Sequence, residues 1–245
     1  MSKTKMQITS ELGTDWWNDS NDIKELQEAV EQGAVGATSN PVITKVTVDD
    51  HHDVWITVID ELIDQNQEKS EDEIAWDLAD EVGRRAATIL EPVYEKTEGQ
   101  KGKLSLQVNP KYYRNAEMMV KQAEHLVSIA PNIAIKNPAV AAGFKSMEEL
   151  TAKGITINAT VSFTVPQAVA AAEAIERGWA RAQENGVDTS TLTPYVTIMV
   201  GRIDDHLKRV MAKENITVDP RVTNWAGVAI FKKAYEIFKE RGYRG

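Results

Sequence analysis

Short apolar segments alternate with longer helical patterns along most of this chain of 245 residues. The sequences VGATSN, KLSLQVNP, NIAIKNP, ITINATVSF and TPYVTIMVGRID have the length and composition of strands, and each is followed by a segment with helical spacing. Alternation of this kind predicts a parallel sheet that is covered by helices.

The helical segments carry recognisable N-terminal signals. They are the capping boxes Ser70–Glu73 and Ser146–Glu149, and the pair Asp219–Pro220. The helix that follows Asp219 is expected to bury one face. That face would hold Val228, Phe231, Tyr235 and Phe238.

The alternation of side chains within the strands helps to choose between the possible α/β folds. In LSLQV, the residues Leu104, Leu106 and Val108 share one face, and Ser105 and Gln107 share the other. The segments NIAIK and ITINAT repeat this pattern of one apolar face and one small or polar face. A doubly wound sheet needs apolar residues on both faces, whereas a (β/α)8 barrel carries functional groups on its inward face. We therefore expect an α/β fold of the TIM-barrel type as a single domain over residues 1–245, with an α+β fold as the alternative.

Lys136 ends the apolar segment NIAIK, where an unpaired charge would be costly to bury. Its side chain either reaches solvent or is present for its chemistry. In the barrel interpretation it shares the inward face with Asn40, Gln107, Asn158 and Thr160. A desolvated lysine has a lowered pKa, and its neutral amine attacks carbonyl groups to form a Schiff base.

Charge and composition exclude several other functions. The net charge of −9 and the pI of about 5.1 argue against a nucleic-acid partner. The chain has no cysteine, and the run DDHH, Asp49 to His52, is expected to be a solvated helix start and not a metal site. The N-terminus has no apolar signal core, and no stretch approaches the roughly 18 apolar residues of a membrane span. We expect a cytoplasmic protein without a membrane partner.

Several motifs together resemble those of the transaldolase family and its relatives, the fructose-6-phosphate aldolases. GATSNP is similar to the second-strand TTNP, IAIKNPAV to the Schiff-base strand IKIPAT, and ITINATVSFTVPQAVAAAEA to INVTLLFSxxQAxAxAEAG. VGRIDD is similar to the phosphate-binding VGRI(D)D, and NDSND to the first-strand ADTGD. Their order and spacing match from about Asp15 to Asp205.

The resemblance implies a TIM-barrel enzyme that moves a dihydroxyacetone unit between phosphorylated sugars of the pentose phosphate pathway. The implied catalytic residues are Lys136 for the Schiff base, Asp19 as acid/base, Thr160 for a proton-relay water, and Gln107. The implied substrate-binding residues are Asn40, Asn158, Thr197 and, for the phosphate, Arg202. No cofactor and no metal is implied, because the iminium itself is the electron sink.

Simpler interpretations of these residues exist. Asp19 could cap a helix, Asn40 could be only a turn residue before a proline, and Thr160 could serve strand packing. Arg202 could form a surface ion pair of little energetic weight with Asp204 or Asp205.

The sequence departs from the family pattern at several positions. Gln107 stands where transaldolases have a glutamate of the proton relay, and a glutamine cannot exchange a proton at neutral pH. The aldolase relatives carry glutamine there, so Gln107 favours aldol cleavage over transfer. Met199 replaces an aromatic residue of those relatives, and Asn137 and Val140 replace an apolar residue and a threonine.

The number of strands is the second departure. With a first strand at NDSND we expect six, whereas the family has eight, so the chain is expected to be truncated at its C-terminus relative to the family. Six strands leave two open edges. A homo-oligomer or a second, completing chain could cover them, and a non-catalytic remnant is the alternative to an enzyme.

Overall fold

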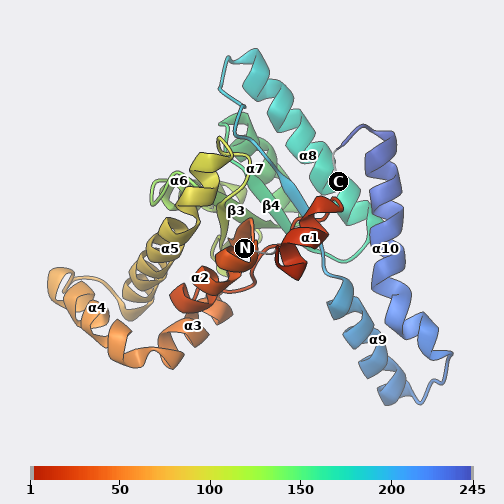
Figure 1. Ribbon diagram of the computed structural model, residues 1–245, viewed down its shortest axis with the longest axis horizontal. Helices are drawn as coiled ribbons and strands as arrows, with labels where there is room; N and C mark the ends of the chain where they lie inside the picture. Colours follow the sequence, from red (N-terminus) through yellow and green to blue (C-terminus); the bar gives the residue numbers. More distant parts are fainter. Residues whose placement is uncertain (1–2, 244–245) are drawn as a thin grey trace. The chain divides into compact units, whose positions relative to one another are not determined.

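The computed structural model describes residues 3–243, and Figure 1 shows its elements in chain order. They are α1 (Lys5–Glu11), α2 (Ile23–Gln32), β1 (Gly36–Thr38), α3 (Pro41–Asp50), α4 (His52–Gln65), α5 (Glu71–Lys96), β2 (Lys103–Gln107), the 3-10 turn η1 (Pro110–Tyr112), α6 (Ala116–Val127), β3 (Ile133–Pro138), α7 (Ala141–Ala152), β4 (Ile157–Ser162), α8 (Val165–Glu184), β5 (Tyr195–Ile198), α9 (Val200–Glu214) and α10 (Pro220–Glu240). The predicted alternation of strands and helices is confirmed.

The strands form a parallel sheet in the order β1-β2-β3-β4-β5. In its first strand pair Ala37 lies opposite Leu104, and in its last pair Asn158 lies opposite Tyr195. Strands that follow one another in sequence and in space, with helices between them, are the pattern of a (β/α)8 barrel. The expected α/β fold of TIM-barrel type is therefore present in incomplete form.

The prediction of six strands is wrong, because the described residues form five. At the expected N-terminal strand only Asn18 pairs with the sheet, in a single bridge to Ala37. The Asn18 amide donates to the Gly36 carbonyl at 3.0 Å, and the Thr38 amide donates to the Asn18 carbonyl at 2.9 Å. One further backbone bond, from the Val35 amide to the Trp16 carbonyl at 3.1 Å, precedes the bridge, and the chain enters the cap of α2 at Asp22 soon after it.

The chain divides into two compact units, which are described separately. The first unit comprises Met1–Val108, Lys121–Ile135 and Ser190–Leu192, and the second comprises Asn109–Val120, Lys136–Thr189 and Thr193–Gly245. Strand β3 is shared, with residues 133–135 in the first unit and 136–138 in the second. The expectation of a single domain stays a prediction.

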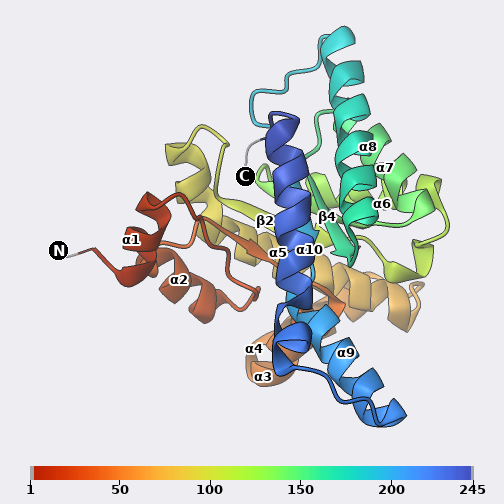
Figure 2. The same ribbon diagram turned by 90° about the vertical axis from the view of Figure 1, so that its right-hand side faces the viewer.

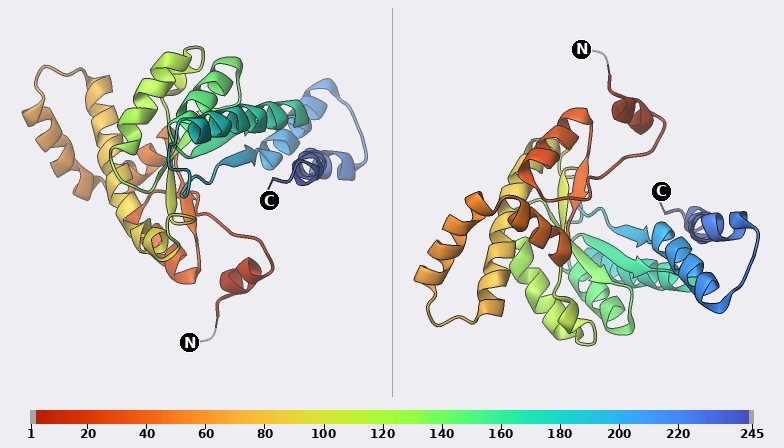
Figure 3. Two further views of the ribbon diagram at one scale, coloured as in Figure 1. Left: turned by 90° about the horizontal axis from the view of Figure 1, so that it is seen from above. Right: turned by 90° about the horizontal axis from the view of Figure 1, so that it is seen from below.

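In the first unit, α5 covers β2. A Cβ at Gly83 would lie 2.9 Å from Leu106 Cδ1, so the glycine allows close approach of helix and strand. Figure 3 shows α4 and α5 running side by side. Trp55 and Val58 of α4 form a buried cluster with Val82 of α5, and the Arg85 guanidinium lies over the Trp55 ring at 4.8 Å. This packing holds α4 on α5.

In the second unit, glycines also set the helix packing. Figure 2 shows α7 beside α8, where a Cβ at Gly178 would lie 2.4 Å from the Glu148 carbonyl oxygen. Helix α10 meets α9 in the same way, because a Cβ at Gly227 would lie 2.3 Å from the Val200 carbonyl oxygen. The Gly227 amide also donates to the Asp204 carboxylate at 3.0 Å.

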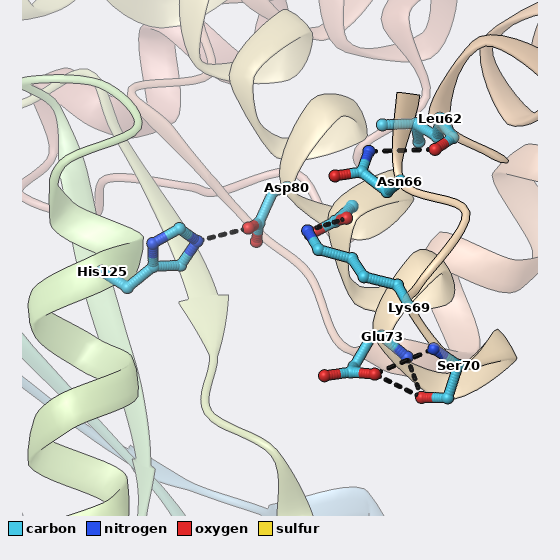
Figure 4. Close-up of polar contacts among 8 residues, drawn as sticks. Leu62, Asn66, Lys69, Ser70, Glu73, Asp80 and His125 are labelled. Atoms are coloured by element: carbon cyan, nitrogen blue, oxygen red, sulfur yellow. Dashed lines mark hydrogen bonds and ion pairs between the residues drawn. The ribbon is translucent and has the colours of Figure 1, made fainter. Parts of the chain in front are cut away.

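Two of the three predicted helix starts are confirmed. The Ser70–Glu73 capping box begins α5, as Figure 4 shows, and Asp219 caps α10. The predicted start at Ser146 is wrong, because α7 begins at Ala141 and Ser146 is buried within it.

The predicted buried face of α10 is wrong in part. Phe231 is 48% exposed and Tyr235 is 42% exposed. The side of α10 that is buried carries small residues, namely Thr223, Gly227 and Ala234. Large side chains there would hold α9 and α10 apart. Within residues 3–243, none of the helices has the length and hydropathy that a bilayer crossing requires.

Candidate active site

Lys136 lies on β3 and is half-buried. The neighbouring Asn137 is fully buried, and its Nδ2 donates to the Ser146 hydroxyl of α7 at 2.9 Å. Because successive strand residues point to opposite faces, Lys136 points away from α7. This is the orientation that the sequence pattern predicted.

The ladder between β3 and β4 gives Lys136 its neighbours. The Ala139 amide donates to the Thr160 carbonyl at 2.8 Å. In a parallel ladder this bond places Pro138 opposite Thr160, and two residues earlier it places Lys136 opposite Asn158. Lys136, Asn158 and Thr160 therefore share one face of the second unit's strands.

Asn158 is held by the next strand. It is 5% exposed, and the Thr197 hydroxyl of β5 donates to its Oδ1 at 2.7 Å. This bond fixes the side-chain amide plane beside Lys136. The structure thus brings together four of the predicted residues, Lys136, Asn158, Thr160 and Thr197, within the second unit, and Thr197 orients Asn158.

Thr160 is 5% exposed, and its hydroxyl lies 3.9 Å from the Met199 sulfur. A thioether is a weak acceptor, so this hydroxyl can turn to a better partner at little cost. Directly after it, Val161 adopts a φ of 54°, and the register of β4 with β5 shifts between Ala159 and Ser162. Such irregularities at a strand end redirect side chains.

Arg202 is exposed on the first turn of α9. Among the residues that the structure describes it forms no ion pair, and Asp204 accepts the Gly227 amide at 3.0 Å. The ion-pair interpretation of Arg202 is therefore not supported. The N-cap residue of α9 is Met199, whose side chain makes no capping hydrogen bond to the amides of the first turn.

In the first unit, Asn40 caps α3. Its Oδ1 accepts the amides of Val42 at 2.9 Å and Ile43 at 3.1 Å, and Pro41 occupies the first helical position. Asn40 is thus a helix N-cap and not the simple turn residue of the alternative interpretation, while its role toward substrate stays a prediction. The side-chain NH₂ group is not used by this cap and can still donate to another group.

Asn40 and Gln107 line the same pocket of about 340 Å³ in the first unit. Most of the other lining residues are apolar, among them Val48, Trp76, Leu78, Leu106 and Leu126. Asp80 also lines this pocket and pairs with His125 Nε2 at 2.6 Å, as Figure 4 shows. Burial raises the pKa of the Asp80 carboxyl, and the His125 contact opposes that shift.

Asp19 is exposed and lines a second hollow of about 430 Å³, together with Asp22, Thr47 and His51. It does not cap α2, because Asp22 does so by accepting the Glu25 amide at 2.9 Å. Asp22 also pairs with His51 Nε2 at 2.7 Å. Within the described residues no cluster of metal-ligating side chains forms, at DDHH or elsewhere.

Lys103, at the start of β2, is a buried cation that the sequence did not reveal. It is 2% exposed, donates to the carbonyls of Gly99 and Thr191, and lies 5.3 Å from the centre of the Tyr94 ring. Burial lowers its pKa from 10.5 to about 8. It lies at the opposite end of β2 from Gln107, so it is a structural residue.

Comparison with known proteins gives a consistent result. The family model described as "Transaldolase/Fructose-6-phosphate aldolase" matches residues 16–244. "Transaldolase" of Thermobifida fusca is 28% identical over 245 residues, which cover 96% of this chain and 65% of that protein. "Transaldolase 1" of Streptomyces avermitilis is 31% identical over 159 residues, which cover 64% of this chain and 42% of that protein. The chain thus spans less than two thirds of the length of these curated relatives.

Proposed function

Because this chain belongs to the transaldolase/fructose-6-phosphate aldolase family, we propose that it acts on phosphorylated ketoses through a Schiff base on Lys136. The observation that carries the proposal is the strand face on which Lys136 lies. It points away from α7 and has Asn158 and Thr160 as ladder neighbours, which is a polar environment for an amine and a sugar.

The reaction begins when the neutral Lys136 amine attacks the C2 carbonyl of the ketose. Loss of water from the carbinolamine gives an iminium. A base then removes the proton of the C4 hydroxyl, the C3–C4 bond breaks, and its electron pair moves into the iminium to give an enamine. The shortened aldose phosphate leaves. The family resemblance assigns the role of that base to Asp19.

The enamine has two possible fates. In transfer it attacks the carbonyl carbon of an acceptor aldehyde, which forms a new C–C bond and regenerates the iminium. In cleavage it takes up a proton and is hydrolysed, which releases dihydroxyacetone. Water regenerates the Lys136 amine at the end of both routes.

Substrate positioning is proposed for the remaining residues. Asn158, oriented by Thr197, would hydrogen-bond the hydroxyls of the bound sugar, and Asn40 would donate from its NH₂ group. Thr160 would hold a water, since within residues 3–243 its hydroxyl donates to the Met199 sulfur, a weak acceptor. Arg202 would bind the phosphate, for which a guanidinium is well suited. The reaction would belong to the pentose phosphate pathway in the cytoplasm.

Aldol cleavage is the second candidate, and Gln107 favours it. A glutamine can orient a water but cannot exchange a proton with it. The predicted proton relay of transaldolases would therefore lack its acid.

A product assay separates the two functions. Fructose 6-phosphate is supplied with and without an aldose phosphate acceptor, and dihydroxyacetone and the new ketose are measured. Transfer predicts product only with acceptor, whereas cleavage predicts dihydroxyacetone without it. Gln107→Glu is expected to shift the ratio toward transfer, and Gln107→Asn serves as the control that changes size but not ionisation. Absence of both products from folded protein would favour a non-catalytic remnant.

A further inference from the structure

Asn21 is a buried polar residue at the centre of a hydrogen-bond network in the first unit. It is 1% exposed. Its Nδ2 donates to the Ser39 hydroxyl at 2.8 Å and to the Thr44 hydroxyl at 2.9 Å, and its Oδ1 accepts the Thr47 hydroxyl at 2.8 Å. One amide group thus joins the segment before α2 to the end of β1 and to α3.

Asn21 lies two residues after Asp19, so its hydrogen bonds fix the segment that carries Asp19. Asp19 lies between two anchors: Asn18 is fixed to β1 by two backbone hydrogen bonds, and Asn21 is fixed by its side chain. Only Ser20 separates Asp19 from the second anchor. Without the Asn21 contacts, the Asp19 turn would be held by Asn18 on one side and on the other side only from Asp22 onward, where Asp22 caps α2 and pairs with His51.

The same network fixes the segment that carries Asn40. Ser39 precedes Asn40, and its hydroxyl lies 3.2 Å from that of Thr44, one turn into α3. The Ser39 amide donates to the Ser105 carbonyl of β2 at 3.0 Å. Ser39, directly before α3, is therefore fixed twice: its hydroxyl is bonded to Asn21, and its amide is bonded to β2 of the sheet.

We propose that Asn21 is a positioning residue that sets the geometry of Asp19 relative to Asn40. The proposal rests on the proposed function, in which both residues act on the sugar. An apolar residue of similar size would fill the space, but it would leave the hydroxyls of Ser39, Thr44 and Thr47 without their amide partner. A buried hydroxyl without a hydrogen-bond partner costs free energy. The segments that carry these hydroxyls would therefore shift until the hydroxyls find other partners.

The first test measures positioning without activity. Amide hydrogen exchange is compared between the wild type and Asn21→Ala. We expect exchange at residues 18–22 and 39–44 to rise about 10-fold or more, with the centre of α5 unchanged, because the opening is local. Asn66→Ala is the matched control: it removes a similar amide, bonded to the Leu62 carbonyl at 2.9 Å in the same unit. Unchanged exchange at residues 18–22 would overturn the proposal.

The second test asks whether Asn21 acts through Asp19. Asn21→Ala is expected to lower kcat about 10-fold in the wild type and less than about 2-fold in the Asp19→Asn background, because residues that act together are not additive. A purely structural role would give the same loss in both backgrounds and would overturn the proposal. If the wild type forms no Schiff base, the proposed function fails, and the exchange experiment alone then decides whether Asn21 positions the segment.

Discussion

Lys103 shows how one buried residue can control the pH dependence of stability. The unfolded chain keeps this proton up to about pH 10.5, whereas the folded chain releases it near pH 8. Between these values the unfolded state binds more protons, so the free energy of unfolding must rise with pH. Among residues 3–243, the ammonium donates hydrogen bonds to the carbonyls of Gly99 and Thr191 and to no carboxylate.

We therefore predict that Lys103→Met removes a rise in stability between pH 8 and 10. The full effect of such a shift is on the order of 3 kcal/mol. Urea unfolding at pH 7.5 and pH 10 measures it, with Lys5→Met, at an exposed lysine of the same unit, as the control. Equal slopes in Lys103→Met and Lys5→Met would show that Lys103 does not titrate in this way.

Thr197 offers a second test at the level of one residue. Thr197→Val keeps the shape of the side chain and removes the hydrogen bond to Asn158 Oδ1. We expect kcat/KM to fall about 10-fold, which corresponds to the 1–2 kcal/mol of one buried hydrogen bond. Thr197→Ser keeps the hydroxyl and should retain activity, so a loss of the same size in both variants would contradict the proposed role.

The sequence predicts the strand face of Lys136, but it does not predict the burial of Asn21 and Lys103. The face of Lys136 follows from strand alternation alone, because Ile133 and Ile135 had to point to the core. Asn21 and Lys103 could not be identified, because their partners are distant in the sequence. Lys103 bonds Thr191, which lies 88 positions away. A lysine at the start of a strand gives no local signal of burial.

At the level of elements, the close helix packing in the second unit can be tested at Gly178. Gly178→Ala would place a Cβ 2.4 Å from the Glu148 carbonyl oxygen, so α7 and α8 must separate. We expect a loss of about 1–3 kcal/mol in the free energy of unfolding, measured by urea denaturation.

Gly201→Ala is the matched control for this prediction. Gly201 is also helical, and a Cβ there would meet nothing within 4 Å. Because alanine favours a helix over glycine, Gly201→Ala should be neutral or stabilising by up to about 1 kcal/mol. Similar effects of the two substitutions would mean that α7 and α8 are not in close contact.

Helix ends were predictable where the signal is local. The Ser70 and Asp219 caps bond amides within three residues, so sequence alone identified them. The Ser146 signal failed because α7 already begins at Ala141, and the Ser146 hydroxyl accepts a hydrogen bond from Asn137 of β3. The buried side of α10 was also not predictable, since close contact with α9 selects Gly227 and excludes Phe231 and Tyr235.

For the whole molecule, the order of strands and helices was predictable, but the number of strands was not. NDSND matches a family motif, yet in this chain a single bridge at Asn18 replaces the strand. The chain leaves the sheet after Asn18, because Asn21 joins the buried network and Asp22 caps α2. The candidate residues also fall into separate groups: Lys136, Asn158, Thr160 and Thr197 in the second unit, and Asn40 with Gln107 in one pocket of the first.

The central claim is that Lys136 forms a Schiff base, and borohydride trapping tests it most directly. The protein is incubated with fructose 6-phosphate, reduced, digested and mapped by mass spectrometry. We predict one stable adduct, on the peptide that contains Lys136, and its loss in Lys136→Ala. The buried Lys103 is the internal control and should stay unmodified. No adduct on Lys136 from folded protein, or an adduct on Lys103 instead, would contradict the account.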